Sequence, residues 1–78
     1  MPDGGAGMVI LSETQVRIMV LLEKGRSNRE IGVALHLSVA GIEYHMGRLF
    51  QKTGATSRVS LALWWREYRQ VNPFERAV

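Results

Sequence analysis

The sequence predicts an all-α domain of four helices, which we expect over residues 12–24, 27–35, 38–53 and 57–71. Two observations lead to this fold class. Apolar residues recur at steps of three and four, which is the period of an amphipathic helix. A serine that can cap a helix N-terminus precedes each of these runs. No run of alternating apolar and polar residues is left over to indicate a β-strand.

The first helix has start and stop signals of its own. Ser12 and Gln15 are spaced as a capping box, in which the Ser12 hydroxyl accepts from the Gln15 amide and the Gln15 side chain reaches back. Gly25 can adopt the left-handed conformation that ends a helix. The apolar residues between these signals, which we expect in the core, are Ile18, Met19 and Leu22.

The second and third helices follow after a short connection. Ser27 and Glu30 repeat the capping box, and Ser38 can cap a longer helix that Gly54 ends. The residues that we expect these two helices to bury are Ile31, Ala34 and Leu35, then Ile42, Met46, Leu49 and Thr53. A connection through residues 36–38 is typical of a helix-turn-helix pair. Such pairs also occur in domains that do not touch nucleic acid.

The fourth helix combines a Ser57 cap with a wide apolar stripe, and Asn72-Pro73 ends it. The stripe consists of Leu61, Trp64, Trp65 and Tyr68. The two tryptophans lie about 100° apart around a helix, so a domain of this size is not expected to bury both. We therefore expect the stripe to form a homodimer interface. The alternative is one tryptophan in the core and the other flat on the surface.

Length and composition indicate one small domain without a cofactor. We expect a flexible leader over residues 1–8, a domain over residues 9–72 and a tail over residues 73–78. The chain has no cysteine, and His36 and His45 lack the partners that a metal site needs. Its carboxylates are scattered and no nucleophile has a positioned base, so an enzyme is not expected.

The sequence also has no signal peptide, and no apolar run approaches the roughly 20 residues that span a bilayer. We expect a cytoplasmic, nucleoid-associated protein. The net charge is +3 and the pI is about 10.0. Between Lys24 and Arg58 six basic residues face two acidic ones, which leaves +4 there, and the rest of the chain is nearly balanced. This distribution suits a polyanionic partner, although a solvated basic surface would also explain it.

The stretch from Leu11 to Ala62 resembles the LuxR/FixJ/GerE type of bacterial DNA-binding domain. The residues that carry the resemblance are Leu11-Ser12, Leu21-Leu22, Gly25, Ser27-Asn28-Arg29-Glu30-Ile31, Leu35, Leu37-Ser38, Ile42, His45, Lys52, Gly54 and Arg58. The resemblance implies that the third helix enters the major groove and that the second helix and the caps touch phosphates. It further implies that the fourth helix mediates dimerisation.

The candidate contact residues follow from this resemblance and from helix geometry. The outer arc of the third helix should carry Glu43, Tyr44, Gly47, Arg48, Gln51 and Lys52. We expect base reading by Glu43, Tyr44 and Gly47, and phosphate contacts by Ser27, Asn28, Ser38, Arg48, Lys52 and Arg58. Arg48 and Lys52 are one helical step apart, so both can approach one phosphate strand. The alternatives are a solvated helix face for these two cations and plain capping for Ser27.

The sequence departs from the family pattern on the third helix. Relatives commonly have a threonine and a basic residue where this chain has Gly41 and Glu43, and Gly47 offers only backbone. Glu43 can accept from a cytosine amino group, and Tyr44 can pack on a thymine methyl or reach a phosphate. We expect altered specificity with modest affinity. His45 is expected to be structural.

The first helix departs from the family pattern as well. Thr14-Gln15 replaces an arginine and an acid that are common in relatives, so a family ion pair should be absent. The leading functional hypothesis is a bacterial transcriptional regulator that binds duplex DNA as a homodimer, either as a stand-alone protein or as a fragment of a longer regulator. The alternative is an interaction module that binds RNA polymerase, a sigma factor or another regulator.

Overall fold

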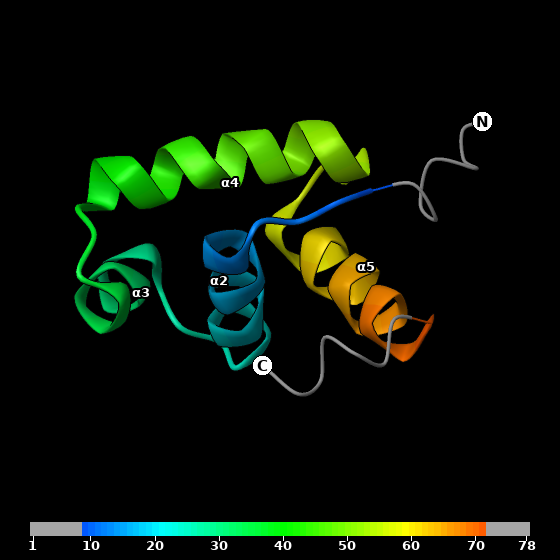
Figure 1. Cartoon of the computed structure of the whole chain (residues 1–78), viewed down its shortest axis with the longest axis horizontal. Coiled ribbons are helices and arrows are strands. Elements are labelled where there is room, and N and C mark those ends of the chain that lie inside the picture. The colour runs from blue at the N-terminus through cyan, green and yellow to red at the C-terminus, as the bar shows by residue number, and fades with distance from the viewer. Residues whose placement is uncertain (1–8, 72–78) are drawn as a thin grey trace.

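The computed structural model describes residues 9–71 and contains four helices in that range. They are α2 (Glu13–Glu23), α3 (Asn28–Leu35), α4 (Val39–Thr53) and α5 (Arg58–Val71), as Figure 1 shows. The all-α prediction is confirmed, and the described residues include no strand. The expected leader, the expected tail and the Asn72-Pro73 stop lie outside the described residues. None of the described helices has the length and apolar character needed to cross a membrane.

Serine hydroxyls begin the helices as predicted. Ser12 Oγ accepts from the Gln15 amide at 3.1 Å and Gln15 Oε1 accepts from the Ser12 amide at 3.1 Å. Ser27 and Glu30 make the same reciprocal pair, at 3.1 Å and 2.9 Å. Oγ atoms of Ser38 and Ser57 accept from the third amide that follows each of them, at 2.9 Å and 3.0 Å. Each helix N-terminus is therefore stabilised by its own local sequence.

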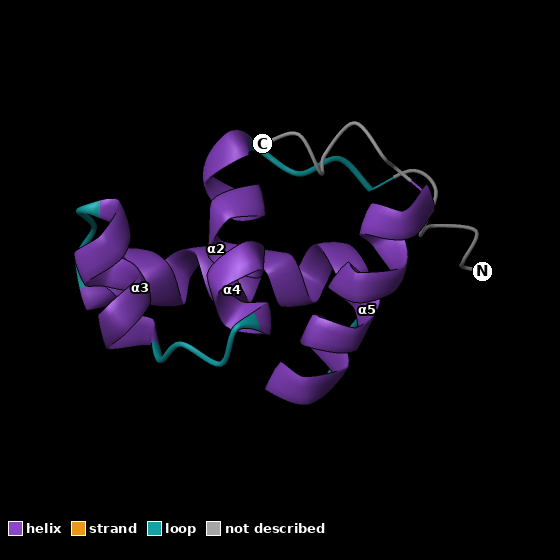
Figure 2. Ribbon diagram, turned by 90° about the horizontal axis from the view of Figure 1, so that it is seen from below, coloured by secondary structure: helices purple, strands orange, loops and turns teal. Residues whose placement is uncertain are grey.

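The core forms where α2 meets the other helices. Figures 1 and 2 show α2 in the middle, with α3 on one side, α5 on the other and α4 lying across them. The buried apolar residues are Val16, Ile18, Met19, Leu22, Ile31, Ile42, Met46, Leu49, Leu61, Trp65 and Tyr68. This set confirms the core predicted for the first and third helices, apart from Thr53, which is half-buried. On the second helix Ile31 is buried as expected, whereas Ala34 is exposed and Leu35 is only half-buried.

The expected dimer interface on the fourth helix is wrong for three of its four residues. Leu61, Trp65 and Tyr68 are buried against α2 and α4 within the same chain, and Trp65 is only 1% exposed. Their side chains are therefore already covered. Trp64 is half-buried and stacks on the Tyr68 ring at a centroid distance of 4.7 Å. The arrangement matches the alternative of one core tryptophan and one surface tryptophan.

The turn between α3 and α4 depends on a close backbone approach at Gly32. The Leu37 amide donates to the Gly32 carbonyl at 2.8 Å, and a Cβ atom on Gly32 would lie 2.6 Å from the Leu37 carbonyl oxygen. His36 between them has a φ of 60°, in the left-handed region that ends α3. Glycine at position 32 therefore lets the turn fold back tightly and sets the direction of α4.

Candidate nucleic-acid interface

The long helix α4 separates a buried face from an exposed one. Its inner face buries Ile42, Met46 and Leu49, whereas its outer face exposes Glu43, Tyr44, Gly47, Arg48 and Gln51. Figure 1 shows α4 along one edge of the molecule, with one long side free of other helices. The helix is 15 residues long, which corresponds to about 22 Å at 1.5 Å per residue. An α-helix presented in this way fits the width of a DNA major groove.

The three predicted base-reading residues lie together on this exposed face. Tyr44 is 63% exposed, and its ring meets the edge of the His45 ring at 5.6 Å. Glu43 is exposed and makes no hydrogen bond or ion pair within residues 9–71. A Cβ atom on Gly47 would meet nothing within 4 Å, so the space around this glycine is open. The centre of the face is therefore acidic, aromatic and bare rather than basic.

Two of the predicted cations, Arg48 and Arg58, differ in whether they have hydrogen-bond partners within the described residues. Arg48 is exposed on the outer face of α4 and has no ion-pair or hydrogen-bond partner in the described part of the chain. Arg58 is also exposed, but it donates to Asn28 Oδ1 at 2.8 Å and to the Arg26 carbonyl at 2.7 Å. Arg58 thus joins the start of α5 to the start of α3 and keeps a positive charge beside Asn28.

Lys52 is turned away from the outer face. It is half-buried, and its Nζ atom donates to Gln15 Oε1 at 2.7 Å and to the Ile10 carbonyl at 2.9 Å. The expectation that Lys52 shares the outer arc with Arg48 is therefore wrong. Helix periodicity could not predict the two acceptors of Lys52, because they lie 37 and 42 positions away from it in the chain. At Thr14-Gln15 the sequence predicts that a family ion pair is absent. Gln15 carries an amide there, and the amide oxygen accepts a hydrogen bond from Lys52.

The N-termini of α3 and α4 already use their serine hydroxyls. The hydroxyls of Ser27 and Ser38 accept from amides of their own helices, and the Glu30 carboxylate accepts from the Ser27 amide. The first amides of each helix still point out of its N-terminal end. Arg26 and Arg29, which the sequence analysis did not select, are exposed beside the start of α3. The N-terminal end of α3 therefore carries two positive charges, from Arg26 and Arg29, and one negative charge, from Glu30.

His45 lies at the border between the two faces of α4. It is half-buried, and its Nδ1 atom is buried without a hydrogen-bond partner among residues 9–71. No group of three or more potential metal ligands occurs among the residues that the structure describes. The geometry therefore gives His45 a packing position beside Tyr44.

Comparison with known proteins places these features in a family. Residues 9–65 match the model of the bacterial regulatory proteins of the luxR family. The chain is also 39% identical over 54 residues to the transcriptional regulatory protein ComA of Bacillus subtilis (strain 168). That match covers 69% of this chain but only 25% of ComA, so the chain spans about a quarter of that relative's length. A search of solved structures found no match. With its four helices and its match over residues 9–65, the chain belongs to the luxR family and carries that family's helix-turn-helix DNA-binding domain.

Proposed function

We propose that this domain binds duplex DNA sequence-specifically to regulate transcription, with the outer face of α4 in the major groove. One observation carries the proposal: α4 buries one face completely in the core and leaves the opposite face open to solvent. A rigidly held helix of this kind can insert without any rearrangement of the fold. Family membership supports the same role.

We assign base reading to Glu43, Tyr44 and Gly47, because all three lie on the exposed face. The proposed phosphate contacts are made by Ser27, Asn28, Ser38, Arg48 and Arg58. Lys52 is left out of this set, since it would have to give up two hydrogen bonds to reach a phosphate. The remaining positive side chains are few, so the affinity at physiological salt should be modest.

We further propose that the domain acts as a homodimer through the exposed side of α5. Val59 is 70% exposed and Leu63 is 53% exposed, and they stand one helical step apart. Half-buried Trp64 lies about 100° further round the helix than Leu63 and packs against the core. A two-fold pair of α5 helices would place two copies of α4 on half-sites about one DNA turn apart.

Selection of bound sites from random duplex DNA tests the proposal directly. The expected result is a palindromic consensus with half-sites about 10 base pairs apart, bound with an affinity that falls as salt rises. Failure to bind any duplex at low salt would reject DNA binding. A non-palindromic consensus would reject the two-fold dimer while retaining the DNA-binding role.

The proposal also covers the cellular location of the domain and its lack of catalytic activity. A regulator of bacterial transcription acts in the cytoplasm, on the nucleoid, and it has no need of catalytic chemistry. The alternative role is docking on RNA polymerase, a sigma factor or another regulator, for which an apolar surface would be suited. Such a surface exists between α2 and α3.

A further inference from the structure

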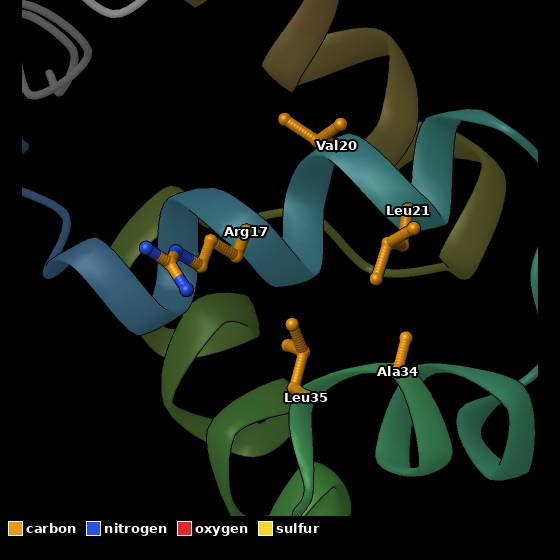
Figure 3. Close-up of a pocket in the computed structure, with 5 residues that line it drawn as sticks. All are labelled: Arg17, Val20, Leu21, Ala34 and Leu35. Carbon is orange, nitrogen blue, oxygen red and sulfur yellow. The ribbon is translucent and has the colours of Figure 1, made fainter. Parts of the chain in front are cut away.

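A groove of about 380 Å³ runs between α2 and α3 (Figure 3). Its lining residues are Arg17, Val20 and Leu21 of α2 and Ala34 and Leu35 of α3. In Figure 3, Leu21 points toward Ala34 and Leu35 across the gap, and Arg17 stands at one end. No lining residue comes from α4 or α5. The groove therefore shares no residue with the proposed DNA contacts or with the proposed dimer surface on α5.

The walls of the groove are almost entirely aliphatic. Arg17 supplies the one charged group of the lining, and its Nη2 atom donates to Glu13 Oε2 at 2.8 Å. Small-molecule sites normally bring several polar groups together to orient the ligand, and this groove does not. A phosphate backbone gains nothing from aliphatic walls. The lining instead suits apolar side chains that enter from a protein surface.

Two cations on the α2 side of the groove, one in its lining and one just beyond it in the chain, indicate the polarity of that surface. Arg17 on α2 and Lys24, the residue that caps its C-terminus, are seven positions apart, about two helical turns, with Val20 and Leu21 between them. Lys24 is exposed and its ammonium group has no partner among the described residues. The pair between Arg17 and Glu13 is 56% and 72% exposed, so it is weak and easily exchanged for another carboxylate. Along α2, the apolar residues Val20 and Leu21 therefore lie between two cations.

We propose that this groove binds an amphipathic helix of a partner protein. Apolar residues of that helix, spaced three and four apart, occupy the space between Leu21 and Leu35. Carboxylates about two turns apart on the same helix meet Arg17 and Lys24. Because the groove and the outer face of α4 share no residue, the domain can hold this helix and a DNA duplex together.

Two variants on α3 provide a matched test. Ala34 and Val33 are adjacent and both exposed, but only Ala34 lines the groove. Ala34→Glu adds bulk and negative charge to the groove, whereas Val33→Glu adds the same group outside it. Both substitutions are at exposed positions, so both proteins should fold, which circular dichroism verifies.

A library of helical peptides with randomised surface positions is displayed and selected on the 78-residue chain, with counter-selection on Ala34→Glu. We expect enriched peptides to carry leucine or phenylalanine at helical spacing together with glutamate or aspartate. A synthetic copy of one such peptide should bind Ala34→Glu at least about tenfold more weakly than the unmodified chain, a change of about 1.4 kcal/mol. Val33→Glu should bind it within about twofold, well below that threshold.

The same peptide, titrated into isotopically labelled chain, should shift the amide resonances of the lining residues and leave those of the α4 outer face unchanged. Three results would overturn the proposal: no enrichment, enrichment of basic peptides, or equal weakening by the two variants. A fourth would do so as well. If Ala34→Glu changes the sedimentation of the peptide-free chain and Val33→Glu does not, the groove is occupied by a second copy of the chain.

Discussion

The Lys52 ammonium group of α4 lies 2.7 Å from Gln15 Oε1 of α2. The same Gln15 oxygen accepts from the Ser12 amide, and Lys52 also donates to the Ile10 carbonyl at 2.9 Å. One side chain thus holds the end of α4 against the start of α2 and the segment before it. Gln15 is buried, so its oxygen depends on these partners. Lys52 therefore positions α4 rather than extending its charged surface.

Replacing Lys52 by methionine should lower stability more than DNA affinity. Lys52→Met keeps the aliphatic stem and removes both hydrogen bonds, so the free energy of unfolding should fall by about 1–2 kcal/mol. Arg48→Met removes a free surface cation and should change that free energy by less than about 0.5 kcal/mol. The salt dependence of DNA binding should weaken by about one phosphate contact for Arg48→Met and stay unchanged for Lys52→Met. Urea unfolding and a salt series measure the two effects, and equal loss of salt dependence would place Lys52 on the DNA.

Alanine at two glycines should change stability in opposite directions. Gly32→Ala places a Cβ atom 2.6 Å from the Leu37 carbonyl oxygen, so the turn must shift and the free energy of unfolding should fall by about 1–3 kcal/mol. Gly47→Ala meets nothing within 4 Å and removes a helix-interior glycine, so stability should rise by about 0.5–1 kcal/mol. Thermal unfolding of the two variants decides the point. A stable Gly32→Ala protein would mean that the turn does not need this close approach.

Local signals were enough to predict where the helices begin, because a capping serine and its partner are only three positions apart. They were also enough for the core faces of α2 and α4, since a helix repeats its inward positions regularly. Contacts between distant segments were not predictable in this way. Lys52 belongs to the outer arc by helix periodicity alone, and only the fold brings Ile10 and Gln15 within its reach. Likewise, a list of α5 residues does not reveal that α2 and α4 cover Trp65.

Two positions on α5 should separate folding from association. Leu63 is 53% exposed, so Leu63→Glu should leave the fold intact and weaken self-association and binding to two-half-site DNA. Trp65 is 1% exposed, so Trp65→Ala should lower the free energy of unfolding by about 3–5 kcal/mol. Sedimentation of the folded Leu63→Glu protein at increasing concentration provides the check. If it associates as the unmodified chain does, the exposed side of α5 is not the dimer surface.

Glu43 should control which bases α4 selects. Its carboxylate is exposed beside Tyr44 and has no partner within the described residues, so nothing in the fold neutralises it. If the carboxylate accepts from a cytosine amino group, Glu43→Gln should lower affinity for the selected site by about 1–3 kcal/mol and relax the preference at one base pair. Glu43→Lys should instead raise affinity for all duplexes and strengthen the salt dependence by about one contact, because it replaces a repelled group by an attracted one. Competition between the selected site and single-base variants measures both effects. An unchanged base preference in Glu43→Gln, with Glu43→Lys behaving as stated, would show that Glu43 limits affinity without reading a base.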